Sequence, residues 1–447
     1  MNVLVAATEF SLPPRISKVS STKFTIDESG WRQYNAAFDG EVPFAHHDLS
    51  MLPEHEQTAA IEAAAMEAQA SLNLTTGPLL RLSFFDTGPG KPGRLLLIAH
   101  HLVMDAISLR FVLEDLATAY EQAAHREPIS LPAKTTSFKT WAEMLVEHAQ
   151  STDVAGELEY WLADERHGMF PLPIDVEDGR QLNTEDSAHT FRVALDAEET
   201  RALLQDVPHV YHTQINDVLM TALALALRPW TDQSRLLVDL EGHGRDAMIK
   251  GTDVTRTVGW FTTIYPVLLE LDAGWGVGEA LKRIKEQLRR LPGRGFNYGL
   301  LRYLHQDLEI RERLRQMPRA EVSFLYLGQL DDALRDSTPF APAAESRGPT
   351  TSARATRSHL LMISGFVSGG RLQLDWTYSV NVHRAATVEQ LAESYLQSLR
   401  DIVRYCSEAE AGGFTPSDFP AAELSQEELD QLIQDLSRNH IEASEAV

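Results

Sequence analysis

Hydrophobic residues along this chain fall into two kinds of segment: short unbroken runs, and longer stretches with helical spacing. Residues 95–99 are all apolar and follow Pro92 and Gly93, which predicts a strand buried on both faces. Apolar positions within residues 109–120 then recur at helical spacing. The sequence therefore predicts a strand, a turn and a helix in direct succession here.

The same two patterns recur in both halves of the chain. They predict helices over residues 54–72, 138–166, 216–227 and 388–406, and strands over residues 79–85, 236–240 and 372–378. Residues 1–22 are expected to be irregular, and residues 339–357 are expected to form a flexible surface loop. Because strands and helices alternate in both halves, we predict an α/β protein with two similar layers.

The length of 447 residues predicts more than one hydrophobic core. Pro and Gly residues between positions 171 and 179 interrupt the pattern, and we place a lobe boundary there. The predicted domains are an N-terminal lobe over residues 1–172, a C-terminal lobe over 173–412, and a linker to a following domain over 413–447. Ser425 and Glu428 have the spacing of a capping box, which predicts a short helix through Leu436.

Composition narrows the class of function. The formal net charge is −24, from 40 basic and 64 acidic residues spread along the chain, which argues against binding nucleic acid or an anionic membrane through bulk charge. Cys406 is the single cysteine, so no intrachain disulfide and no cysteine metal cluster can form. No apolar stretch is long enough to cross a bilayer, and we expect a cytoplasmic protein with no bound metal.

The predicted turn after residue 99 carries the first candidate chemistry. His100 and His101 open the stretch HHLVMDAISL, with Asp105 four residues after the second histidine. A neutral imidazole takes and returns a proton near neutral pH, so a general base is one interpretation of this turn. The other is a structural pair of histidines that hydrogen-bond to the backbone.

A second candidate follows the predicted strand 236–240, where the chain reads EGHGR. Glu241 there is either a solvated loop residue or a partly desolvated carboxylate whose raised pKa suits proton transfer. Three later stretches, RTVGWFTTIYP, GRGFNYG and FLYLGQ, combine glycine with aromatic residues. Each of them taken alone is also explained by core packing.

Taken together and in this order, six stretches resemble one family: HHLVMDAIS, NDVLMTALA, EGHGRDA, TRTVGWFTTIYPVLL, GRGFNYG and FLYLGQLD. They are similar to the epimerization domain of nonribosomal peptide synthetases, which belongs to the condensation-domain superfamily. The resemblance covers roughly residues 25–436, and EGHGR with RTVGWFT distinguishes epimerization from condensation domains. It implies two chloramphenicol-acetyltransferase-like lobes that form a V-shaped pseudo-dimer with an active-site tunnel.

The resemblance also implies a reaction. A peptidyl carrier protein brings an aminoacyl or peptidyl thioester on its 4'-phosphopantetheine arm, and the α-carbon is inverted from L toward D. The domain itself then needs no bound cofactor, and its partners are the carrier protein and neighbouring synthetase modules. By likeness, His101 and Glu241 are the catalytic pair and face the α-carbon from opposite sides.

Other residues receive supporting roles from the same likeness. Asp105 is expected to form a salt bridge with Arg245 that holds the histidine loop. His100 either supports the orientation of His101 or is simply packed in the turn. Trp260 is expected either to wall the tunnel or to pack in the core.

Ala106 and Tyr326 are expected to line the tunnel, and here the chain departs from the family pattern. Ala106 stands where the family usually has Gly, beside the expected path of the pantetheine arm. Leu325 replaces the usual Asn before Tyr326. The first 22 residues match none of the family's opening helix and strand, so the N-terminal lobe is expected to be truncated and to expose a sheet edge.

Two alternative functions remain open from the sequence. One is a condensation domain, in which His101 assists the attack of an amine on a thioester; Glu241 and the RTVGWFT stretch argue against it. The other is a degenerate domain that binds carrier proteins without catalysis, which Ala106, Leu325 and the unmatched N-terminus favour.

Overall fold

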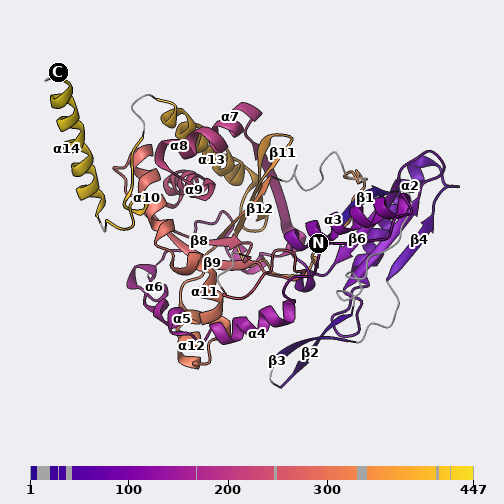
Figure 1. Cartoon of the computed structure of the whole chain (residues 1–447). Coiled ribbons are helices and arrows are strands. Elements are labelled where there is room, and N and C mark those ends of the chain that lie inside the picture. The colour runs from indigo at the N-terminus through magenta and orange to yellow at the C-terminus, as the bar shows by residue number, and fades with distance from the viewer. Residues whose placement is uncertain are drawn as a thin grey trace. The chain divides into compact units, whose positions relative to one another are not determined.

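The structure, a computed structural model (Figure 1), describes residues 2–7, 21–28, 30–36, 43–167, 169–245, 249–329, 340–408, 412–422 and 424–445. The chain divides into two compact units. The first unit comprises Met1–Glu147, His243–Thr262 and Asp332–Ser352; the second comprises His148–Gly242, Thr263–Asp331 and Ala353–Val447. These units do not follow the linear division predicted at residues 172 and 412, because the chain returns to the first unit at residue 243, where Arg245 pairs with Asp105.

The first unit is built on a four-stranded sheet in the order β1, β6, β5, β4. The strands are β1 (Asn2–Ala7), β4 (Phe44–Asp48), β5 (Leu80–Asp86) and β6 (Gly93–Ala99). β6 pairs antiparallel with β1 and β5, and β4 pairs parallel with β5. The prediction that residues 1–22 are irregular is therefore wrong for residues 2–7, whose backbone pairs with β6 and covers that edge of it.

Two helices cover opposite faces of this sheet, α2 (Glu54–Ala70) and α3 (Ala106–Ala124). Side chains 95 and 97 of β6 share a core with α3, whereas side chains 96 and 98 share a core with α2. The prediction of a strand buried on both faces, followed by a helix, is confirmed. The unit also contains a hairpin of β2 (Thr22–Asp27) and β3 (Gly30–Asn35), and most of α4 (Phe138–His148).

The second unit contains a six-stranded mixed sheet in the order β7, β12, β11, β10, β8, β9. The strands are β7 (Ala188–Ala194), β8 (Arg235–Gly242), β9 (Thr263–Glu270), β10 (Val322–Gln329), β11 (Leu361–Ser368) and β12 (Arg371–Ser379). β10 runs parallel to both β8 and β11, and the other pairs are antiparallel.

Helices α9 (Ile215–Thr231), α10 (Val277–Arg289) and α13 (Ala385–Cys406) lie on one face of this sheet (Figure 1). Tyr395 of α13 contacts the rings of Phe324 and Trp376, which marks the helix-covered face. Because side chains alternate along a strand, Leu240 shares that face and its neighbour Glu241 projects to the other. The shorter helices are α5 (Thr152–Gly156), α6 (Leu158–Trp161), α7 (Ala197–Arg201), α8 (Val207–Tyr211), α11 (Phe296–Gly299) and α12 (Leu308–Gln316).

Most predicted elements are confirmed; besides residues 2–7, three segments differ for local reasons. Residues 138–166 do not form one helix, because Ser151 caps a new one by accepting a hydrogen bond from the Val154 N–H. Glu241 and Gly242 belong to β8 instead of following it. Within residues 340–357, Phe340 joins the core of the first unit, so the described part of this segment is not a free surface loop.

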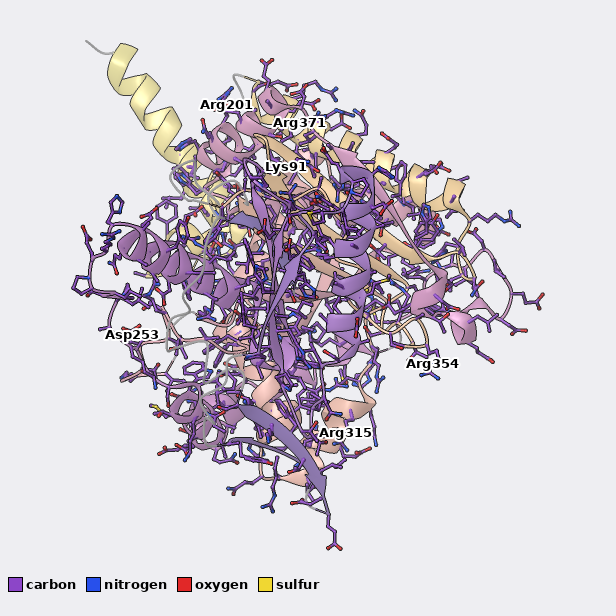
Figure 2. The ribbon with its side chains drawn as sticks, turned by 90° about the vertical axis from the view of Figure 1, so that its right-hand side faces the viewer. Lys91, Arg201, Asp253, Arg315, Arg354 and Arg371 are labelled. Atoms are coloured by element: carbon purple, nitrogen blue, oxygen red, sulfur yellow. The ribbon has the colours of Figure 1, made fainter. Side chains whose placement is uncertain are left out.

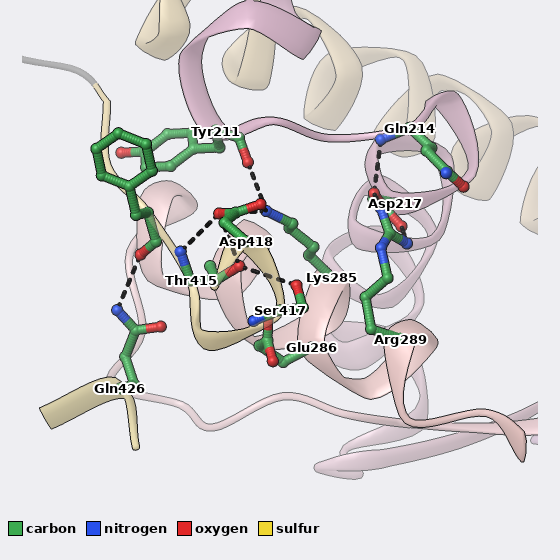
Figure 3. A network of polar contacts seen from close by, with 11 residues as sticks. Tyr211, Gln214, Asp217, Lys285, Glu286, Arg289, Thr415, Ser417, Asp418 and Gln426 are labelled. Atoms are coloured by element: carbon green, nitrogen blue, oxygen red, sulfur yellow. Dashed lines mark hydrogen bonds and ion pairs between the residues drawn. The ribbon is translucent and has the colours of Figure 1, made fainter. Parts of the chain in front are cut away.

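The predicted C-terminal capping box is present: Glu428 N–H donates to Ser425 Oγ, and Ser425 N–H donates back to the Glu428 carboxylate. It opens α14 (Gln426–Glu445), which is longer than predicted. Figure 3 shows the segment before it. The buried Lys285 ammonium donates to Asp418 Oδ1 at 2.6 Å and to the Tyr211 carbonyl at 2.9 Å. The start of the predicted linker is thereby anchored to α10.

Charged residues are distributed over both units, as the sequence indicated. Figure 2 shows exposed charged side chains on the first unit, including Lys91 and Asp253, and on the second, including Arg315 and Arg371. Among the helices that the structure describes, none is long and apolar enough to span a membrane.

Candidate active-site residues

His100 organises the turn that follows β6. Its backbone N–H donates to the Leu79 carbonyl at 2.9 Å, and its ring Nδ1 accepts a hydrogen bond from the Leu102 N–H at 3.2 Å. An accepting Nδ1 requires the neutral imidazole with its proton on Nε2. Burial lowers the pKa of His100, which favours that neutral form. His100 therefore caps the short 3₁₀ turn His101–Val103.

His101, the first residue of that turn, has an exposed side chain. Its ring centroid lies 4.9 Å from that of Trp260, with the two planes tilted by 43°. Trp260 is itself 40% exposed, so it borders the imidazole and is not enclosed in a core. The imidazole of His101 is therefore accessible and has the apolar ring of Trp260 beside it.

Asp105 lies at the start of α3 and is 3% exposed. One carboxylate oxygen accepts from the Ser108 N–H at 2.7 Å, which caps the helix, and the other accepts from the Phe261 N–H at 3.1 Å. Arg245 Nη2 lies 3.0 and 3.2 Å from the same two oxygens. The salt bridge between Asp105 and Arg245 that the resemblance implied is present, and with its hydrogen bonds it ties the start of α3 to residues 245–261.

Most hydrogen-bond donors of the Arg245 guanidinium have buried acceptors. Nη1 donates to the carbonyls of Val254 and Thr257 at 2.8 and 2.9 Å, and the guanidinium carbon lies 4.1 Å from the Phe261 ring centroid. Burial lowers the pKa of Arg245, and Asp105 acts in the opposite direction. Such a buried charge is tolerated because its partner and hydrogen bonds replace water.

Ser108 and Gly259 belong to the same network, and sequence reasoning did not single out either as a functional residue. The buried Ser108 hydroxyl accepts from Arg245 Nη2 and from the Gly259 N–H, and it donates to the Gly259 carbonyl. A Cβ on Gly259 would lie 2.1 Å from a ring carbon of Phe138. Both residues lie inside motifs that were recognised in the sequence, which is the feature that could have identified them.

Ala106 is the first residue of α3, directly after the capping Asp105, and its side chain is exposed. Its exposure is compatible with the predicted place beside a pantetheine arm, and its role stays a prediction.

Glu241 lies near the end of β8 in the second unit. Its register partners are Ile264 on β9 and Leu325 on β10, so the three side chains share one face of the sheet. Burial raises the pKa of Glu241; a positive charge on His359 lowers it, and Asp239 raises it. Because Leu325 offers no hydrogen bond, it leaves the carboxylate with an apolar neighbour where the family usually has an amide.

The EGHGR stretch connects the two units in sequence, because Glu241 belongs to the second unit and Arg245 to the first. Gly244 has φ +64°, a conformation that a side chain disfavours, and the Arg245 N–H donates to His243 Nδ1 at 3.1 Å. The glycine therefore permits the turn that follows β8.

Tyr326 is not brought to the same sheet face as Glu241. Since Leu325 is the register partner of Glu241, the next residue projects to the opposite face. Its ring packs over Gly365, where a Cβ would lie 3.4 Å from Tyr326 Cδ2. Burial raises the pKa of Tyr326. The tunnel role expected for Tyr326 stays a prediction.

Solved structures of known proteins define the class of this fold. The chain is 32% identical to the epimerization domain from the third module of tyrocidine synthetase B, with a TM-score of 0.79 over 91% of each chain. This likeness identifies a mixed α/β fold of the chloramphenicol-acetyltransferase-like class, as the sequence predicted.

The family follows from the sequence matches. The condensation-domain profile matches residues 22–425, and the chain belongs to the condensation-domain family. It is 46% identical over 412 residues to a component of the linear gramicidin synthase of Brevibacillus parabrevis, covering 92% of this chain and 5% of that protein. Chondramide synthase of Chondromyces crocatus is 42% identical over 420 residues, covering 92% of this chain and 10% of that protein. The chain thus spans a small part of the synthetases that it matches.

Condensation and epimerization domains are enzymes that bind no cofactor themselves. In nonribosomal peptide synthetases their substrate is carried on the phosphopantetheine of a carrier domain. The resemblance to an epimerization domain of this superfamily is confirmed by the matches to the family profile and to the solved epimerization domain.

Proposed function

We propose that this chain epimerizes the α-carbon of an aminoacyl or peptidyl thioester carried on the phosphopantetheine arm of a peptidyl carrier protein. The observation that carries the proposal is Glu241, a partly buried carboxylate in the EGHGR stretch of a chain similar to a solved epimerization domain. A condensation reaction needs no second proton-transfer group of this kind, whereas inversion at carbon does.

The chemistry requires two groups. The α-proton beside a thioester is weakly acidic, so a base must remove it while the enolate is stabilised. A proton then returns to the same carbon on its other face. We assign these transfers to His101 and Glu241, and each direction of the reaction uses both.

The surroundings of each group suit that work. The capped turn of His100 and the buried pair of Asp105 and Arg245 hold the backbone of His101 while its ring stays accessible. Partial burial raises the pKa of the Glu241 carboxyl toward the pH range in which it can both accept and release a proton.

The test is α-proton exchange in D₂O. A peptidyl carrier protein is loaded with an L-aminoacyl phosphopantetheine, the 447-residue chain is added, and α-deuterium and D-product are measured. We expect both, and we expect His101→Ala and Glu241→Gln each to lower exchange roughly a hundred-fold or more. Matched controls are His125→Ala, just after α3, and Glu270→Gln on β9, which lie at exposed positions of the same units and should leave exchange unchanged.

The same assay separates the alternatives. Peptide formation with a second loaded carrier, without exchange, would identify a condensation domain. Carrier binding without either reaction would identify a degenerate domain, and exchange that survives Glu241→Gln would overturn the assignment of Glu241.

A further inference from the structure

A chain of three polar side chains lies in the second unit beside Glu241. His359 Nε2 lies 2.8 Å from Asp239 Oδ2, and His359 Nδ1 lies 2.9 Å from Ser358 Oγ. Asp239 and His359 are 120 positions apart in the sequence, and His359 lies outside every motif recognised in the sequence. His359 is 9% exposed and the Asp239 side chain is 21% exposed, so this contact is partly sheltered from water.

Hydrogen bonds fix the backbone on both sides of the His359 side chain. The Asn183 side-chain amide donates to the carbonyls of Arg357 and His359 at 3.2 and 3.0 Å. The N–H of Leu360 donates to the Glu321 carbonyl at 2.8 Å. A segment pinned in this way keeps its imidazole against Asp239 without a large entropic cost.

Asp239 and Glu241 project from the same face of β8, two residues apart, which places their Cα atoms roughly 7 Å from each other. Charges at that separation interact measurably at the effective dielectric of a protein. Burial is the largest cause that raises the pKa of Glu241; a positive charge on His359 lowers that pKa, and the Asp239 carboxylate raises it. A positive charge on His359 therefore offsets the effect of Asp239 on Glu241.

Either protonation state of His359 keeps its hydrogen bonds. A serine hydroxyl donates to an unprotonated Nδ1 and accepts from a protonated one, so Ser358 serves both forms. Other ionisable groups described in the second unit around this cluster include Tyr298, whose pKa Asp239 raises, and Arg302, which donates to Tyr298. The buried Arg357, two residues before His359, pairs with Glu185.

We propose that His359, held between Asp239 and Ser358, is a positioning residue that sets the charge beside Glu241 and thereby the pH range in which Glu241 transfers protons. This inference rests on the proposed function of Glu241. It adds a residue that acts through Glu241 and does not touch the reacting carbon.

The test compares variants that keep or remove the charge at this position, using the pH dependence of α-proton exchange by the full chain. The limb of the profile that belongs to Glu241 is first identified by its loss in Glu241→Gln. His359→Gln and His359→Asn replace the imidazole by neutral amides, and we expect both to move that limb to higher pH by roughly one unit. His359→Lys restores a positive charge, and we expect its limb at or below the wild-type position.

A purely structural role predicts a different pattern. His359→Gln and His359→Lys would then lose exchange to a similar extent, with the limb unmoved, and that result would overturn the inference. Circular dichroism melting shows which variants fold. If neither amide variant folds, His359→Lys alone tests the inference. A shift of the Glu241 limb to higher pH in the profile of His359→Lys would then refute the role of the charge. Exchange that persists in Glu241→Gln instead refutes the role assigned to Glu241, and the absence of exchange by the wild-type chain refutes the proposed function.

Discussion

The buried pair of Asp105 and Arg245 gives the sharpest test of how the histidine turn is held. We consider Asp105→Asn, which preserves the shape of the side chain and removes its charge. An asparagine still presents one oxygen to the Ser108 N–H, so the cap of α3 survives. Its amide nitrogen, however, replaces the oxygen that accepts from the Phe261 N–H and from Arg245, and the guanidinium loses its anion.

The magnitude follows from these contacts. Removing one partner of a buried ion pair costs about 3–5 kcal/mol. Arg245 keeps the carbonyls of Val254 and Thr257 and the hydroxyl of Ser108, so we expect the lower end, about 3 kcal/mol. In a unit of this size that corresponds to a melting temperature lower by roughly 6–12 °C.

The assay is urea unfolding together with differential scanning calorimetry of the full chain. Glu114→Gln is the control, because Glu114 pairs with Arg110 and Arg256 at a partly exposed position and should cost less than about 1 kcal/mol. Adding Arg245→Met to Asp105→Asn should recover part of the loss, since the orphaned charge is then gone. A loss for Asp105→Asn no larger than that of the control, or no recovery in the double variant, would refute this reasoning.

Three further predictions concern packing, pH and the C-terminal segment. Gly259→Ala places a methyl against Phe138 and should destabilise the first unit by about 1–3 kcal/mol in urea unfolding, with partial recovery when Phe138→Leu is added. Burial lowers the pKa of His383 below its ordinary value of 6.5, although Asp175 opposes this, so on acidification the unfolded chain binds that proton before the folded chain does. The free energy of unfolding should therefore fall as the pH drops below 6.5, and the urea midpoints of His383→Asn should fall less than those of the exposed control His189→Asn. Lys285→Met removes the buried ammonium that donates to Asp418 and to the Tyr211 carbonyl (Figure 3), and it should speed proteolysis within residues 412–422. The exposed-pair control Arg283→Met should not.

The candidate site was predictable where chemistry and sequence motif coincide. His101, Asp105, Glu241 and Arg245 lie in recognisable stretches, and the pairing of Asp105 with Arg245 followed from the family resemblance. His359 was not predictable in this way, because its contact with Asp239 depends on β10 lying between β8 and β11 in the sheet. Leu325 was recognised as a departure, but only the strand register places it beside Glu241.

The sequence by itself determined the elements that depend on near neighbours. The buried strand before His100, the amphipathic helices and the capping box of Ser425 and Glu428 arise from side-chain periodicity and from hydrogen bonds three or four residues apart. Only the tertiary structure decided what depends on pairing between distant strands: the return of residues 243–262 to the first unit, the opposite faces of Glu241 and Tyr326, and the contact of Asp239 with His359. The physical reason is that a strand has no partner of its own, and a shift of one residue in its register would exchange every side chain between the two faces of the sheet.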